Sequence, residues 1–407
     1  MIYENSTDAI PYQYKWFFYD CIWEGNKIIF AASNCNAICE MDISTGSTCI
    51  IEVADEEKDI FLSHGIYKWK EYIILPDRNA KPGLHLFNLT SREWSYIAVE
   101  DSRKGWMNFR EEGVFEYNGY LYIFPSALVV LKVDIEKKSI DYIFYPDMKP
   151  EDDCRGEIAF IDDTVYIPTK HGVNIHKFDL TSEQWEIVEV KTDLKGIDTL
   201  CYDGRQFWMS GVGRMICSWD EEKNVSVSFY DFPQGFCKLE EIAESAARED
   251  EDGWWFGESF LYGESIFFLP NDANMLIEFD TETKEIRELS IAGEEETQES
   301  LERKGRFSAV KYMGAKQKDN LLMMLSNKNK NLILLDLRTK KAKKIELRIY
   351  SESEWDKIIS TKRTMYEGLL NLQVWLKKVI NKENQYNVQQ QREIVGKKIY
   401  STDRFEK

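Results

Sequence analysis

Seven positions, repeated along the chain, hold side chains that could do chemistry together if the fold gathered them. They are Asp20, His64, Gly113, Glu157, Asp198, Glu258 and Ser308. Four are carboxylates and one is an imidazole, which are the groups that proteins use to bind cations and to transfer protons. Carboxylates at close range cannot all stay ionised without a counter-charge. Their convergence would therefore predict a site for a cation, a cationic ligand group or ordered water.

A second set of polar residues lies one expected strand later in several of these copies, and it mixes hydrogen-bond donors with acceptors. Such a rim suits polar ligands such as sugars or peptides. The candidate ligand-binding residues from both sets are Asp20, His64, Arg78, Glu157, Lys170, His171, Asp198, Arg214, Glu258 and Asp272. The weak catalytic candidates among them are His64, His171 and Glu157.

Both sets of residues recur because a sequence motif is repeated seven times along the chain. Each copy contains a short strand, a turn, a very apolar second strand and a third strand that ends in Asp or Asn. The residues that end the third strands, which we call the anchor residues, are Asp42, Asn88, Asp134, Asp179, Asp220, Asp280 and Asp336. A period of roughly 40–50 residues with strand-like alternation is typical of a β-propeller.

The sequence therefore predicts an all-β fold over residues 1–347, a β-propeller of seven four-stranded blades. The expected blades span about 14–54, 63–99, 110–145, 154–190, 195–232, 254–291 and 306–347. In a propeller the innermost strands begin around one mouth of the central channel. This architecture would bring the seven chemical positions together at that mouth.

Residues 348–407 follow a different pattern, and we expect a C-terminal α-helical extension there. Apolar residues between Trp355 and Ile380 recur at spacings of three, four and seven, which places most of them on one helical stripe. Two interpretations stay open for helix 352–380. It could pack against the outer edge of the propeller, or it could provide a contact for a partner or for self-association.

The third and fourth strands carry a further pattern. Trp94 and Trp185 each lie six residues after an anchor residue, Asn88 and Asp179, and the second strand is strongly apolar. In these features the chain resembles the kelch-like propellers over nearly all of residues 14–347. It lacks their Gly-Gly doublets at the end of the second strand, where Pro76, Pro125, Pro168 and Pro270 stand instead.

Charge and composition narrow the classes of partner and compartment. The formal net charge is −19, and a chain this acidic repels phosphate backbones, so we expect no nucleic-acid partner. The N-terminus has no secretory pattern and no apolar run approaches 18 residues, so we expect no membrane association. The eight cysteines are sparse, which favours reduced thiols in a cytoplasmic protein.

No strong catalytic or cofactor motif occurs. Phosphate-binding, dinucleotide-binding, nucleophile-elbow and zinc-protease patterns are all missing, and Cys35 with Cys39 lacks a second pair of zinc ligands. We therefore expect no cofactor and no metal.

The first hypothesis is a non-enzymatic cytoplasmic scaffold that binds a protein partner or a polar ligand, such as a glycan, at the channel mouth. The alternative is a carbohydrate-acting enzyme, lyase-like or epimerase-like, that uses the acidic residues and His64 or His171 there. A third hypothesis is an assembly module.

Overall fold

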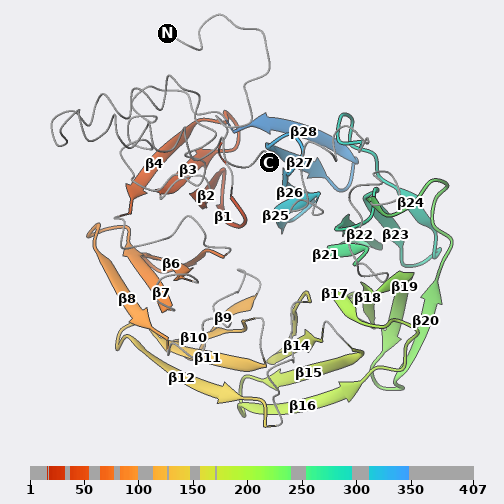
Figure 1. Cartoon of the computed structure of the whole chain (residues 1–407), viewed down its shortest axis with the longest axis horizontal. Helices are drawn as coiled ribbons and strands as arrows, with labels where there is room; N and C mark the ends of the chain where they lie inside the picture. The colour runs from red at the N-terminus through yellow and green to blue at the C-terminus, as the bar shows by residue number, and fades with distance from the viewer. Residues whose placement is uncertain are drawn as a thin grey trace, which may run out of the picture.

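The computed structural model describes residues 16, 18–32, 37–54, 65–77, 83–99, 113–125, 128–146, 156–169, 172–239, 254–295 and 311–347. These residues form seven antiparallel sheets of four strands each. The sheets stand around one central axis, with the first strand of each at the hub and the fourth at the rim (Figure 1). The chain is therefore a seven-bladed β-propeller, which confirms the predicted fold class. We number the sheets as blades 1 to 7 in chain order.

The four strands of every blade follow one another in sequence from hub to rim. The innermost strands are β1 (Cys21–Glu24), β5 (Tyr67–Trp69), β9 (Val114–Tyr117), β13 (Ala159–Ile161), β17 (Ile197–Tyr202), β21 (Phe256–Tyr262) and β25 (Tyr312–Lys318). The second strands are β2 (Lys27–Ala32), β6 (Tyr72–Asp77), β10 (Tyr120–Ile123), β14 (Thr164–Pro168), β18 (Phe207–Gly211), β22 (Ser265–Pro270) and β26 (Leu321–Ser326). The third strands are β3 (Ala37–Asp42), β7 (Gly83–Asn88), β11 (Val129–Asp134), β15 (Asn174–Asp179), β19 (Gly213–Asp220), β23 (Ile277–Asp280) and β27 (Asn331–Asp336). The outer strands are β4 (Thr48–Val53), β8 (Trp94–Ala98), β12 (Ser139–Phe144), β16 (Gln184–Glu189), β20 (Val225–Phe229), β24 (Ile286–Glu288) and β28 (Lys341–Glu346).

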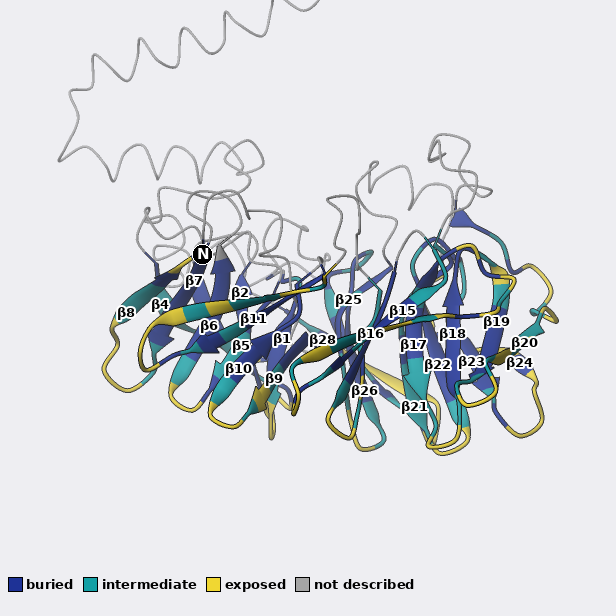
Figure 2. Ribbon diagram, turned by 90° about the horizontal axis from the view of Figure 1, so that it is seen from below, coloured by how far each residue is buried: buried dark blue, intermediate teal, exposed yellow. Residues whose placement is uncertain are grey.

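The two faces of the ring differ in the connections that they carry. Turns between first and second strands, and between third and fourth strands, lie on one side, which we call the turn face (Figure 2). The opposite side, the loop face, carries the other connections, including those between blades, and the innermost strands begin there. Four of the candidate residues and the predicted C-terminal extension lie outside the described residues and stay predictions: His64, Arg78, Lys170, His171 and residues 348–407 with helix 352–380.

Each anchor residue ends its third strand and shapes the turn that follows. The side-chain oxygen of each accepts a hydrogen bond from a backbone N–H two or three residues later, as in the Asp42 bonds from Ser44 and Thr45. The Ser44 and Thr45 hydrogen bonds lower the pKa of Asp42 to about 2. An Asp or Asn is needed here because its short side chain can reach its own turn.

The residue four positions after each anchor adopts a left-handed backbone conformation. Gly46 fills this position in blade 1, and side-chain-bearing residues fill it in the other blades: Arg92, Lys138, Glu183, Asn224, Lys284 and Lys340. A left-handed conformation costs an L-residue roughly 1–2 kcal/mol. Several of these side chains compensate by reaching into the preceding blade, so the turn also links neighbouring sheets.

Seven apolar clusters hold the ring together, and each lies between two neighbouring blades. Blades 2 and 3, for example, share Leu86, Ile97, Leu121 and Leu131. The other six clusters occupy the remaining six seams. Because both faces of each sheet are covered, the second strands are buried along almost their whole length, which explains their nearly continuous apolar sequence.

Side-chain packing closes the ring between the first and last blades. All four strands of blade 1 come from the N-terminal end of the described chain and all four of blade 7 from its C-terminal end. Trp16, Phe18 and Phe30 pack with Leu325, and the Trp16 N–H donates to the Leu347 carbonyl at 2.9 Å. The two ends are therefore joined by an apolar seam and a backbone hydrogen bond, and no strand of either blade is exchanged.

Polar contacts supplement the apolar seams near the turn face. Lys132 of blade 3 pairs with Glu183 of blade 4 at 2.6 Å, and Glu183 also accepts a hydrogen bond from the Tyr122 hydroxyl at 2.7 Å. Between blades 6 and 7 the equivalent pair is Glu278 with Lys340, which reverses the two charges. In both pairs one partner lies two residues before an anchor and the other lies four residues after the next anchor.

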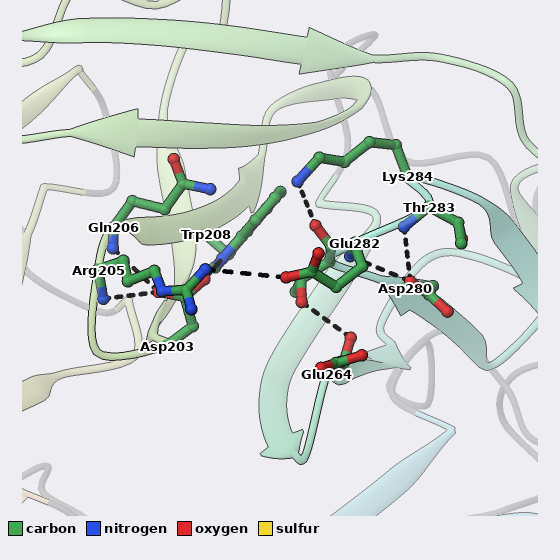
Figure 3. A network of polar contacts seen from close by, with 10 residues as sticks. Asp203, Arg205, Gln206, Trp208, Glu264, Asp280, Glu282, Thr283 and Lys284 are labelled. Atoms are coloured by element: carbon green, nitrogen blue, oxygen red, sulfur yellow. Dashed lines mark hydrogen bonds and ion pairs between the residues drawn. The ribbon is translucent and has the colours of Figure 1, made fainter.

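At the seam between blades 5 and 6, an aromatic ring takes part in the polar contact between the blades. The indole N–H of Trp208 donates to Asp203 at 2.7 Å, and the Lys284 ammonium lies 4.7 Å from the Trp208 ring centre (Figure 3). Arg205 and Glu282 form a looser, exposed pair across this seam at 3.8 Å. The left-handed residue of blade 6 thus makes a cation–π contact with blade 5.

Replacement of Glu183 by Lys is expected to destabilise the protein by roughly 1 kcal/mol, since it places two ammonium groups together between blades 3 and 4. The double variant Lys132→Glu/Glu183→Lys should recover most of that loss, because the Glu278–Lys340 seam already uses the reversed polarity. Urea unfolding of all three proteins measures the effect. Glu136→Lys at the exposed Lys70–Glu136 pair is the control and should change stability little. Equal stability of Glu183→Lys and the parent would contradict the role of this pair.

Candidate functional site at the channel mouth

Glu157 connects three blades at the hub. It lies two residues before β13 in blade 4, and its Oε2 atom accepts hydrogen bonds from the Leu200 N–H of β17 at 3.2 Å and from the Ser259 N–H of β21 at 3.0 Å. The Ser259 hydroxyl donates to the same oxygen at 2.6 Å. Strands β17 and β21 lie side by side at the hub (Figure 1), and the carboxylate of Glu157 joins them.

A close backbone approach places Glu157 there. The Glu157 N–H donates to the Asp198 carbonyl at 2.6 Å. A Cβ atom on the preceding Gly156 would lie 2.6 Å from Pro168 and 2.9 Å from the Ile197 carbonyl, so only glycine fits at that position. Gly156 is therefore required for Glu157 to take this position.

β-Bulges orient the neighbouring acidic residues. The register of β17 shifts between Ile197 and Thr199, which leaves Asp198 as the extra residue of the strand. The register of β21 shifts between Phe256 and Glu258. A bulge breaks the alternation of side chains and redirects them, and bulges are common beside functional sites. Here they lie at the beginnings of two adjacent inner strands, next to the two carboxylates.

The surroundings of Glu157 favour its neutral form. Burial of its carboxyl group, together with the nearby charge of Glu258, raises the pKa from an ordinary value of 4.5 to about 8. The three hydrogen bonds act in the opposite direction but are outweighed. Glu157 as a residue is only half-buried, because a side chain that lines a hub can be surrounded by protein atoms and still touch solvent. Burial raises the pKa of the Cys201 thiol on β17, and the nearby Glu157 carboxyl group adds to this increase.

Asp20 occupies a different electrostatic environment, although it belongs to the same repeated set. It is buried before β1 and pairs with Lys316 of β25 at 2.9 Å across the seam between blades 1 and 7. Gly314 has a left-handed conformation, and a Cβ atom there would lie 3.1 Å from the Tyr19 carbonyl. The counter-charge of Asp20 thus comes from the protein itself.

Two other candidates contact the segment that follows β20. Arg214 is exposed at the beginning of β19 and lies 5.8 Å and 5.6 Å from the ring centres of Phe232 and Phe236. Asp272 is buried and accepts a hydrogen bond from the Trp254 N–H at 2.9 Å. Both residues therefore have structural contacts of their own around this segment.

The structure adds two residues that sequence reasoning missed. Ser259 supplies two of the three hydrogen bonds to Glu157, and Lys316 neutralises Asp20. The repeat alignment compared equivalent positions and therefore passed over Ser259, which follows Glu258, and Lys316, which lies beyond a register shift in β25. Their partners lie 102 and 296 positions away in the sequence, and no local signal reports such contacts.

The described hub therefore holds a carboxyl group that is poised to be neutral near pH 7, beside further acidic residues from two adjacent blades. Within the residues that the structure describes, no three His, Cys, Asp or Glu side chains are placed to hold a metal ion together. No helix in that same part of the chain is long and apolar enough to cross a membrane. The arrangement is suited to hydrogen bonding and to attraction of positive charge.

Comparison with known proteins supports the fold alone. By sequence, no protein-family profile and no curated protein matches the chain. By structure it is similar to a chain of the mitotic checkpoint complex, with a TM-score of 0.50, 10% identity and coverage of 84% of this chain and 92% of that chain. It is also similar to the computationally designed protein Ika8 (TM-score 0.49, 10% identity, 82% and 87% covered) and to BamB from Moraxella catarrhalis (TM-score 0.46, 11% identity, 76% and 79% covered).

Replacement of Glu157 by Gln is expected to remove a pH dependence of stability. With a folded pKa of about 8 and an unfolded value near 4.5, the parent protein is favoured at low pH and loses this contribution as the pH rises through 8. The free energy of unfolding of the parent minus that of Glu157→Gln should therefore fall steadily between pH 5 and pH 8. Urea unfolding at several pH values measures it. A difference that stays constant over that range would show that Glu157 ionises normally.

Proposed function

We propose that this chain is a non-enzymatic propeller scaffold that binds a basic segment of a partner protein at the channel mouth on the loop face. The observation that carries the proposal is the meeting of Glu157, Asp198 and Glu258 at adjoining inner strands of three successive blades. A lysine or arginine side chain would add positive charge where the negative charge of Glu258 already disfavours ionisation of Glu157.

The overall charge supports the same class of partner. The chain carries a net charge of −19, and acidic proteins attract basic partners and speed their encounter. A rigid ring also suits binding, because the propeller keeps the inner strands in place before the partner arrives and little ordering is needed on association. A polar small molecule or a glycan with a cationic group would be recognised by the same carboxylates.

The kelch-like type and the cytoplasmic location belong to this proposal. Trp94 and Trp185 pack against Phe87 and Phe178 with ring centres 4.9 Å apart, so the aromatic residue after each of these anchors supports its own blade. Six cysteines within the described residues are free thiols: Cys21, Cys39, Cys49, Cys201, Cys217 and Cys237. Free thiols are usual in a reducing compartment.

One observation favours the carbohydrate-acting enzyme as a second candidate. A carboxyl group with a pKa of about 8 is protonated at neutral pH and could donate a proton to a leaving group, as a general acid does. Glu258 would then supply the second carboxyl group of the site. Glu157→Gln separates the candidates, since it would abolish turnover of a glycoside by an enzyme but leave binding of a basic peptide by a scaffold largely intact.

Binding of a lysine- and arginine-rich peptide, measured by calorimetry against a charge-reversed acidic peptide, tests the scaffold. We expect the basic peptide to bind, and Glu258→Gln to weaken it about tenfold, or about 1.4 kcal/mol. Added salt should weaken the binding, because solvent-exposed charges are screened.

The matched control is Glu136→Gln, which removes the same charge from an exposed turn at the rim. Its affinity should equal that of the parent. If both peptides bind alike, or if Glu258→Gln and Glu136→Gln lower the affinity equally, the attraction is a property of the whole acidic surface and the channel mouth is not the site.

A further inference from the structure

The exposed apolar side chains of the propeller gather in one sector of the ring. Within the described residues, the large apolar side chains that are exposed all belong to blades 3 to 5 or to the residue after blade 5: Phe144, Phe160, Ile187, Val225, Val227 and Tyr230. Three of the six lie on β20 or directly after it. Val225 and Val227, which lie on the same face of β20, are 54% and 53% exposed, and contiguous exposed apolar residues often mark an interaction site.

Strand β20 also has a free edge. It is the last strand of its sheet, at the rim of the ring (Figure 1), and among the described residues its only partner strand is β19. Proteins usually protect such an edge with charged side chains, because its unpaired N–H and C=O groups can pair with another strand. The sequence of β20 is Val-Ser-Val-Ser-Phe and holds no charge.

The other outer strands differ from β20 in this respect. Lysines occupy three of the six positions of β28, and β16 and β12 carry glutamate or aspartate. Strand β8 is uncharged, but its Ile97 is buried and its Trp94 and Tyr96 pack against His85. Of these rim strands, β20 alone combines an uncharged edge with exposed apolar side chains.

The strand is held in place from both faces. On one face Phe229 packs against Phe279, with ring centres 5.2 Å apart. On the other, the hydroxyls of Ser226 and Ser228 donate to Lys191 and Asp193 of the segment that enters blade 5. The edge is therefore presented by a fixed strand, and pairing would order little additional chain.

We propose that two copies of this chain associate by antiparallel pairing of their β20 strands about a two-fold axis at Val227. This register sets Val227 opposite Val227, Ser226 opposite Ser228 and Val225 opposite Phe229, so that each face of the joined sheet continues with side chains of the same kind. A closed two-fold contact of this type uses the same patch on both copies and ends at a dimer.

Charges at the ends of the strand favour the same register. Residues 223 and 231 are equally distant from Val227, so Lys223 of one copy would lie opposite Asp231 of the other. Both are exposed, and the Lys223 side chain is 74% exposed although it contacts Asp220 within its own turn. An axis at Ser226 would pair Val225 with Val227 but would set Lys223 opposite Phe229, and an axis at Ser228 would set Lys223 opposite Pro233. Only the axis at Val227 sets Lys223 opposite an acidic residue.

Sedimentation of the full chain over a range of concentrations tests the proposal. We expect a monomer–dimer equilibrium, and we expect Val227→Lys to weaken dimerisation at least tenfold, because two ammonium groups would meet on the axis. Ile187→Lys on β16 is the matched control, an exposed apolar residue of another rim strand, and it should leave the equilibrium unchanged. Melting curves confirm that both variants are folded. A parent protein that stays monomeric throughout would overturn the proposal.

Disulfide formation tests the register independently of stability. Directly opposed residues of an antiparallel pair have Cα atoms about 4.5–5.5 Å apart, within the range of a disulfide bond. Oxidation should therefore cross-link Val227→Cys into a dimer, whereas Val225→Cys, which faces Phe229, should cross-link no faster than the parent with its exposed Cys49. Equal cross-linking of the two variants would refute this register, and a dimer unaffected by Val227→Lys would place self-association elsewhere, for example in residues 352–380.

Discussion

The structure depends on one constraint, that a four-stranded sheet with two apolar faces must be covered on both sides. In this chain the sheets cover one another. Each of the seven apolar clusters is shared by two blades, including the cluster that joins blade 1 to blade 7. No blade has a core of its own, so the ring must close before any sheet is fully buried. Closure also fixes what meets at the hub and what is left at the rim.

The sequence predicted the features that repeat and missed those that break the repeat. The anchor residues marked the ends of all seven third strands, because a short polar side chain is needed to cap the same turn each time. The apolar second strands were equally plain, since burial on both faces leaves them no polar side. Bulges at Asp198 and before Glu258 were not predictable, because a one-residue register shift follows from packing against the neighbouring blade and leaves no local pattern.

The candidate site illustrates the same division. Repeat alignment selected Asp20, Glu157, Asp198 and Glu258 as equivalent, and equivalence in sequence did not mean equivalence in charge environment. Asp20 is neutralised by Lys316, whereas burial keeps Glu157 largely neutral by raising its pKa to about 8. A propeller with different residues in each blade thus builds an asymmetric hub on a symmetric backbone, and only the inter-blade contacts show which positions are structural and which can meet a ligand.

The rim shows why the two proposed surfaces are separate. Side chains at the hub are shared among blades, so a substitution there acts on several sheets at once, as the contacts of Glu157 with β17 and β21 indicate. An outer strand has a neighbour on one edge only, and its exposed residues can vary without disturbing the apolar seams. On β28, Lys344 pairs with the buried Glu294 at 2.9 Å, so part of that strand's charge serves the fold, whereas the exposed Val225 and Val227 of β20 meet no such demand. Because folding does not require the uncharged and self-complementary edge of β20, association of two copies explains it better. Pairing of the two rims would leave both channel mouths open to a partner.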